Sequence, residues 1–130
     1  MDLKTACDLI ARQTLPELET QDTFLGRLRQ GFPPVPGQAT ALLLALKVIH
    51  SSLQRASALD RRLAQSLFLV AYESRNLYEV GRANRADWPP MLDEDLTRIA
   101  IAAYAIFADS TDDLAYAFVP ENAQNNRTKG

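Results

Sequence analysis

The sequence predicts an all-α fold, a single four- or five-helix bundle with short proline-rich connectors. The strongest observation is the stretch Ala39–Ile49, in which Lys47 is the only charged residue and good helix formers dominate. Such a segment predicts a helix that is buried on most of its circumference. Two proline-rich segments, at residues 32–37 and 88–90, interrupt the helical pattern, and no segment alternates as a strand would.

Composition is that of an ordinary soluble domain, with 47% hydrophobic residues, 23% charged residues and a net charge of −2. We expect one bundle domain over residues 1–119 and a disordered, polar tail over residues 120–130. Cys7 is the only cysteine and residues 1–15 carry charges where a signal peptide is apolar, so we expect a cytoplasmic protein. No uncharged apolar stretch approaches the about 20 residues that a membrane-spanning helix needs. The net charge argues against a nucleic-acid partner held by bulk electrostatics.

The first predicted helix covers about Asp2–Gln13 and ends before Pro16, because proline disfavours a helical conformation in the residue before it. A short second helix begins near Thr20 or Asp22, either of which could cap it. Gly31 predicts its end, since glycine readily adopts the left-handed conformation that terminates helices.

The central helix is predicted over about Gln38–Ala56, and the third over about Ala58–Val80. Ser57 and Asp60 resemble a capping box at the start of the third helix, and Gly81 near its end, followed by Asn84, suggests fraying or termination. The residues expected to face the core from these two helices repeat at helical spacing: Leu42, Leu46, Ile49, Leu53, Leu59, Leu63, Leu67, Val70 and Leu77. The apolar arc is widened by Leu43, Leu44 and Val48 on the central helix and by Phe68, Leu69, Tyr72 and Tyr78 on the third.

The last long helix is predicted over about Met91–Ala108, and a final helical turn over Leu114–Val119. Its inward residues are Leu92, Leu96, Ile99, Ala103 and Ile106. Asp93, Glu94 and Asp95 fall in its first turn, where negative charge favours the helix dipole. Consecutive helical residues diverge by about 100°, so we expect these carboxylates to stabilise the helix start and not to converge on a cation.

Signatures of catalysis are missing from the sequence. It has no Gly-Lys-Ser/Thr phosphate loop, and His50 is the only histidine, which excludes a pair of histidine ligands. A Cys7–His50 nucleophile is formally conceivable, but Cys7 lies on an apolar helix face, as a small buried hydrophobe does. His50 is expected to be a structural or surface residue. We predict no catalytic residue, no metal ion and no cofactor.

The two connectors carry the candidate interface, which comprises Phe32, Val35, Trp88 and Met91. Aromatic side chains beside rigid prolines lose little entropy on binding and behave as interface anchors. The alternative is that each aromatic ring folds onto its own bundle and closes one end of the core.

A second candidate site is an anion contact formed by Arg75, Arg82 and Arg85 near the end of the third helix. Arg75 and Arg82 are two turns apart on one face, but Glu79 between them is a competing partner. A solvated surface with cations near a helix end is the alternative. A third, weaker option is a nucleic-acid contact through Arg55, Arg61 and Arg62.

Three sequence blocks are distinctive: PPVPGQ at residues 33–38, LLLALK at 42–47 and WPPMLDEDL at 88–96. Over about residues 1–109 the sequence resembles a group of small cyanobacterial all-helical proteins of unknown function, which implies an all-helical fold. Some members of that group are labelled dethiobiotin synthetase. Enzymes of that name use a phosphate loop in an α/β fold, and this sequence has neither, so no catalytic residue is carried over.

For function, we expect a non-enzymatic protein-interaction module, a regulator, assembly factor or adaptor that is a candidate homodimer. The alternative is a small-molecule-binding helical domain or unusual enzyme with a pocket between the last two long helices. That pocket would draw its polar groups from Tyr72, Tyr78, Tyr104, Arg75 and Arg82.

Overall fold

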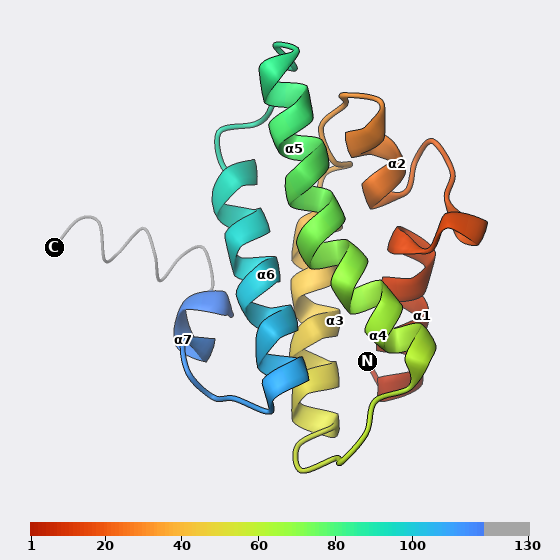
Figure 1. Cartoon of the computed structure of the whole chain (residues 1–130), viewed down its shortest axis with the longest axis vertical. Coiled ribbons are helices and arrows are strands. Elements are labelled where there is room, and N and C mark those ends of the chain that lie inside the picture. The colour runs from red at the N-terminus through yellow and green to blue at the C-terminus, as the bar shows by residue number, and fades with distance from the viewer. Residues whose placement is uncertain (119–130) are drawn as a thin grey trace, which may run out of the picture.

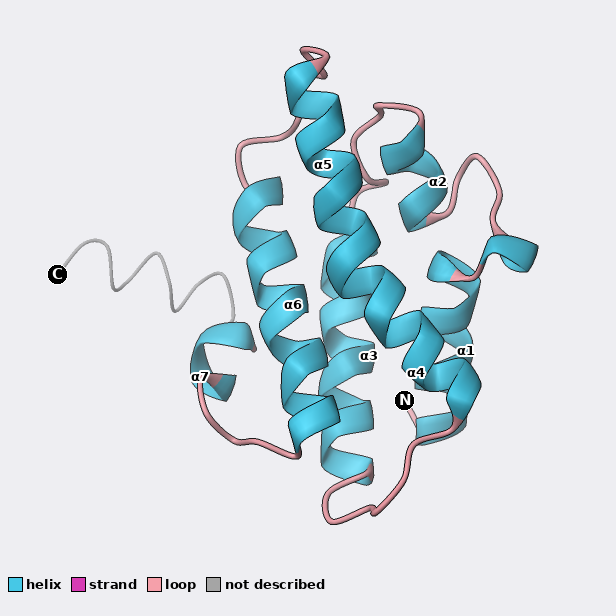
Figure 2. Cartoon of the chain, in the orientation of Figure 1, coloured by secondary structure: helices cyan, strands magenta, loops and turns pink. Residues whose placement is uncertain are grey.

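The computed structural model describes residues 1–118, and within them every regular element is a helix (Figures 1 and 2). In chain order the elements are α1 (Leu3–Thr14), η1 (Pro16–Leu18), α2 (Phe24–Arg29), α3 (Gln38–Ser52), α4 (Arg61–Phe68), η2 (Leu69–Glu73), α5 (Ser74–Ala83), α6 (Leu92–Ala108) and α7 (Leu114–Ala117). The predicted all-α bundle is therefore confirmed. Val119 and the predicted tail, residues 120–130, lie outside the described residues.

Within the described part of the chain, four long helical segments form the body of the bundle. They are α1, α3, the continuous α4–η2–α5 segment and α6. The helix α3 packs against α1 and α6, and the α4–η2–α5 segment contacts α1 through α4 and α6 through η2 and α5 (Figure 1). The short helix α2 packs against α5, and α7 packs against α6.

The core consists mainly of leucine and isoleucine side chains, as the periodicity predicts. The largest fully buried side chains are Phe24, Ile10, Leu15, Leu25, Leu28, Leu42, Leu46, Ile49, Leu67, Leu96, Ile99 and Val70. The helix α3 is buried or partly buried on most of its circumference, but Leu44, predicted to broaden its apolar stripe, lies with Lys47 on an exposed face. The reason is that α3 buries the faces that contact α1 and α6, while this outward face remains open to solvent.

The first half of the chain follows the predicted order, with one different cap. Thr23 caps α2, because its Oγ1 accepts a hydrogen bond from the Gly26 N–H at 3.3 Å, so neither Thr20 nor Asp22 is the cap. Gly31 follows the helix end with a φ of 79°, as predicted for a terminator. A 3₁₀ turn, η1, follows α1 and was not predicted.

The long segment α4–η2–α5 follows the predicted third helix but begins and ends later. Asp60, and not Ser57, is the N-cap, since its carboxylate accepts a hydrogen bond from the Leu63 N–H at 3.1 Å. The segment contains one π-helical turn, η2, and continues past Val80 to Ala83. The helix before it, α3, ends at Ser52 and not at Ala56.

Two polar contacts tie the end of α3 to the turn after α6. The His50 ring Nε2 lies 2.8 Å from the Ser110 carbonyl oxygen, and the Arg55 N–H donates to the Asp109 carboxylate at 3.0 Å. The sequence leaves open whether His50 is a structural or a surface residue. His50 is buried, so its role is structural.

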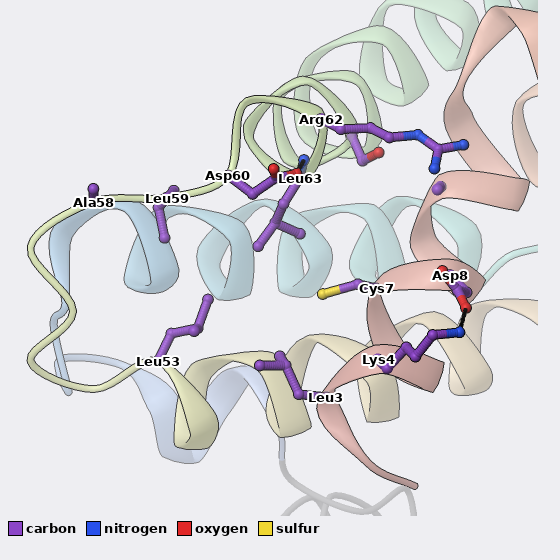
Figure 3. A pocket seen from close by; sticks show the side chains of 12 residues that line it. Leu3, Lys4, Cys7, Asp8, Leu53, Ala58, Leu59, Asp60, Arg62 and Leu63 are labelled. Atoms are coloured by element: carbon purple, nitrogen blue, oxygen red, sulfur yellow. Dashed lines mark hydrogen bonds and ion pairs between the residues drawn. The ribbon is translucent and has the colours of Figure 1, made fainter.

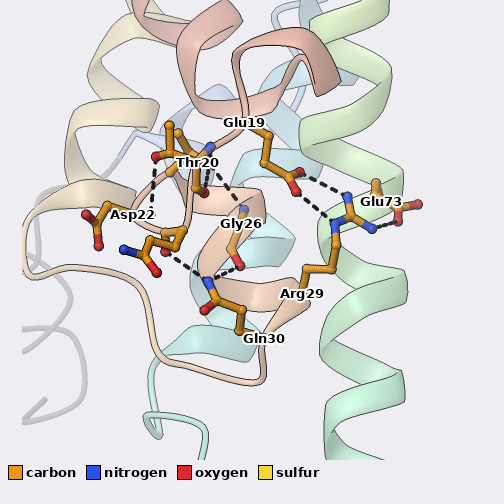
Figure 4. A network of polar contacts seen from close by, with 9 residues as sticks. Glu19, Thr20, Asp22, Gly26, Arg29, Gln30 and Glu73 are labelled. Atoms are coloured by element: carbon orange, nitrogen blue, oxygen red, sulfur yellow. Dashed lines mark hydrogen bonds and ion pairs between the residues drawn. The ribbon is translucent and has the colours of Figure 1, made fainter.

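A network of polar contacts centred on Arg29 joins α2 to the long segment (Figure 4). The Arg29 guanidinium donates two hydrogen bonds to Glu19, at 3.1 and 3.2 Å, and a longer one to Glu73 at 3.4 Å. The hydrogen bond to Glu19 raises the pKa of Arg29 above its ordinary value. Because Glu73 belongs to η2, this network fixes α2 and the loop before it against the middle of the long segment.

Candidate functional site

Four exposed aromatic side chains lie on the α4–η2–α5 segment and on α6. Their exposed fractions are 55% for Phe68, 58% for Tyr72, 67% for Tyr104 and 48% for Phe107. We call this set the aromatic face. On α6 the spacing of three residues between Tyr104 and Phe107 places both on one side of the helix. The rings of Phe68 and Tyr72 stack with centroids 5.2 Å apart.

The two halves of the aromatic face belong to neighbouring helices. Arg75 joins them, because its guanidinium donates to the Asp93 carboxylate at 2.6 Å and to the Thr97 hydroxyl at 3.0 Å. Beyond this junction α6 packs mainly against η2, and the N-terminus of α4 and the C-terminus of α6 diverge, with α3 visible between them (Figure 1). Tyr72 and Phe68 precede Arg75 by one and two turns. Tyr104 follows Thr97 by two turns on the same side of α6.

The two stretches of sequence that carry these rings contain few charged residues. Residues 63–72 contain no charged side chain, and the only charged residue from 96 to 108 is Arg98. Arg98 is buried and turned away toward α7, where its guanidinium lies 5.4 Å from the Tyr116 ring centroid. Exposed aromatic rings are typical of the centre of a protein interface.

Sequence reasoning assigned the aromatic face to other roles. Phe68 and Tyr72 were predicted to widen the core, and Tyr72, Tyr78 and Tyr104 to line a pocket between the last two long helices. That arrangement is wrong, because Tyr72 and Tyr104 are more than half exposed and Tyr78 packs against Trp88. The available signal was the position of Tyr104, which lies off the stripe of inward residues on α6.

The two proline-rich connectors meet in space. Val35 from the first connector and Met91 from the second line one shallow groove of about 170 Å³. The remaining wall includes the prolines 34, 36 and 89, residues 37, 39 and 40, and Leu92 and Asp95 of α6. Val35 and Met91 are both exposed, as candidate interface residues need to be. We call this feature the connector groove.

The two connector aromatics differ in placement. Phe32 is 49% exposed, and the Arg27 guanidinium lies 5.5 Å from its ring centroid. Trp88 instead folds onto its own bundle, where its indole N–H donates to the Tyr78 carbonyl at 2.9 Å. Its ring also fills the space beside Gly81. Trp88 therefore follows the alternative in which the ring closes one end of the core, because its N–H finds a partner there.

The candidate anion contact is largely neutralised by neighbouring carboxylates. Arg75 pairs with Asp93 at 2.6 Å and lies 3.8 Å from Glu79, while Arg82 pairs with Glu79 at 3.1 Å. Arg85 is exposed at the end of the helix with a φ of 62°. The three guanidiniums thus do not present a common unpaired surface to an anion.

The remaining candidates do not assemble a reactive centre among residues 1–118. In the acidic triplet, Asp93 faces Arg75 while Glu94 and Asp95 face Arg98, so the three carboxylates diverge as predicted. No group of three or more potential metal-binding side chains occurs in this part of the chain. Its helices are also too short or too polar to cross a membrane.

The chain was compared with protein-family models, with curated proteins and with solved structures, and none of the three comparisons finds a match.

Proposed function

We propose that this chain is a non-enzymatic protein-interaction module that self-associates through the aromatic face. The observation that supports this proposal is the presence of four exposed aromatic side chains on two neighbouring helical segments, in stretches of sequence with few charged residues. Exposed apolar patches of this kind mark interaction surfaces on soluble proteins. Aromatic anchors also supply a large share of the binding energy at interfaces.

A second copy of this chain is the partner that suits this surface. A pair of antiparallel helices can pair with itself across a two-fold axis, which produces a four-helix interface. Each copy would then cover the aromatic rings of the other, and the rings could adopt offset or edge-to-face arrangements. The connector groove includes Leu92 and Asp95 at the N-terminal end of α6, away from Tyr104 and Phe107, and it offers a surface for a further partner.

The test is sedimentation velocity of the purified full chain over a range of concentrations. We expect the wild type to sediment as a dimer and the double variant Tyr104→Glu, Phe107→Glu as a monomer, because both side chains are exposed and a charge there opposes burial. Circular dichroism should show the same helix content in both proteins.

Leu44→Glu is the matched control, since Leu44 is an equally exposed apolar residue on the outward face of α3. It should remain dimeric. A wild type that stays monomeric up to about 100 μM, or a control that dissociates as readily as the double variant, would contradict the proposal.

A further inference from the structure

A cavity of about 390 Å³ opens between α1, the end of α3 and the start of α4 (Figure 3). Its volume falls in the range of small-molecule sites in proteins. The walls are mainly apolar and include Leu3, Ala11, Leu53, Ala58, Leu59 and Leu63. In the view of Figure 3, Leu53 and Leu59 lie toward one end of the cavity and Arg62 toward the other. This cavity is separate from the aromatic face and from the connector groove.

One polar group in the cavity wall has no partner. Ser66 is 1% exposed, and its hydroxyl makes no hydrogen bond to the protein. A buried serine in a helix normally bonds to the carbonyl one turn earlier, as Ser74 does with Val70. Leaving a buried hydroxyl without a partner is costly, so this group calls for a ligand atom in the cavity.

Arg62 supplies a charge beside that hydroxyl. Arg62 precedes Ser66 by four residues, so both side chains lie on the same face of α4. Arg62 lines the cavity and has no ion pair among the described residues. The other cation at the rim, Lys4, is paired with Asp8 at 3.3 Å, and Asp60 is engaged in capping α4.

The Cys7 side chain also lines the cavity. Burial, followed by the negative charges of Asp8 and Asp60, raises the pKa of Cys7 above its ordinary value. The thiol is therefore neutral at physiological pH and behaves as part of the apolar wall. Because it is the only cysteine in the chain, its alkylation reports on the cavity alone.

We infer that this cavity binds a small amphiphilic carboxylic acid. The carboxylate accepts hydrogen bonds from the Ser66 hydroxyl and the Arg62 guanidinium, which satisfies the orphaned group and neutralises the free charge. The apolar chain lies between Leu3, Leu53 and Leu59. This site uses no residue of the aromatic face, so the result of the self-association test neither supports nor contradicts it.

Alkylation of Cys7 by N-ethylmaleimide, followed by mass spectrometry at pH 8.5, tests the inference with decanoate as the probe. Saturating decanoate should slow alkylation at least threefold and raise the unfolding temperature, because bound ligand shields the thiol and stabilises the native state. Decanol, which has the same chain without the carboxylate, should bind at least threefold more weakly.

Two variants locate the carboxylate. Ser66→Ala should weaken decanoate binding about three- to tenfold, while the unliganded protein remains at least as stable, since the change removes an unsatisfied buried hydroxyl. Arg62→Gln should weaken binding to a similar degree. Arg61→Gln is the matched control, because Arg61 is an exposed neighbour that does not line the cavity.

The outcomes separate clearly. Protection by decanoate that falls in Ser66→Ala and Arg62→Gln but not in Arg61→Gln supports the site. No protection, equal protection by decanol, or an equal loss in Arg61→Gln overturns it.

Discussion

At Gly81 the indole of Trp88 occupies the space that a side chain would fill. A Cβ atom added there would lie 2.2 Å from Cζ2 of the indole. The ring is held in this position by its hydrogen bond to the Tyr78 carbonyl and by packing on the Tyr78 ring, with centroids 6.0 Å apart. The sequence places the helix end near Gly81 and Asn84, and α5 continues through Gly81 to Ala83 with Asn84 as its C-cap, so the glycine serves this close approach.

Gly81→Ala should therefore destabilise the protein by about 1–3 kcal/mol, because the added methyl group overpacks the contact with Trp88. In an uncrowded helix the same change is stabilising by about 1 kcal/mol. Urea denaturation measures the difference in the free energy of unfolding. In a Trp88→Ala background the clash is gone, and Gly81→Ala should become stabilising. A stabilising effect in the wild-type background would contradict the contact.

The burial of two polar residues, Arg98 and Ser66, was not predicted from the sequence. Arg98 is buried and pairs with Glu94 at 2.6 Å, yet a pair spaced by four residues is equally typical of exposed helix surfaces. Ser66 likewise occupies an inward position that the leucine pattern alone does not reveal. Periodicity predicts where apolar side chains point, but a buried polar group depends on which elements meet around it.

The sequence predicts that the long segment α4–η2–α5 is helical, but it does not predict the residues at which this segment begins and ends. Residues 61–80 contain neither glycine nor proline, so nothing in the sequence interrupts the helix. The π-helical turn η2 therefore has no local signal. At the N-terminus, Ser57 and Asp60 are both good capping residues, and the sequence does not discriminate between them.

Asp60→Ala should lower the free energy of unfolding by about 1 kcal/mol, because the Leu63 N–H loses its capping acceptor. Ser57→Ala is the matched control and should leave stability unchanged within about 0.5 kcal/mol, since Ser57 is exposed and outside the helix. Chemical denaturation of both variants decides between the two caps. A larger loss in Ser57→Ala would show that the helix begins earlier.

For the molecule as a whole, the fold follows from the leucine pattern and the site does not. Leu42, Leu46 and Ile49 were predicted to face the core from α3, and all three are fully buried. The aromatic face, in contrast, joins side chains from residues 68–72 and 104–107, which are distant in sequence. Their adjacency depends on how α6 packs against the long segment, and that packing is a tertiary property that local periodicity cannot supply.

Leu46→Ala should destabilise the protein by about 2–5 kcal/mol, because it leaves a cavity at the centre of the bundle. Leu44→Ala, two residues earlier on the outward face of the same helix, should change stability by less than about 0.5 kcal/mol. Thermal or urea unfolding measures both. Similar losses in the two variants would show that α3 is rotated relative to the arrangement described above.

The inward placement of Trp88 also gives the chain an optical property. Trp88 is the only tryptophan, so all indole emission comes from one half-buried ring at the junction of α5 and the second connector. That ring lies on Tyr78 and donates a hydrogen bond to its carbonyl, so the emission wavelength reports whether this junction is closed. The protein thus carries a built-in fluorophore for its connector end, remote in sequence from Cys7, the only thiol available for a second label.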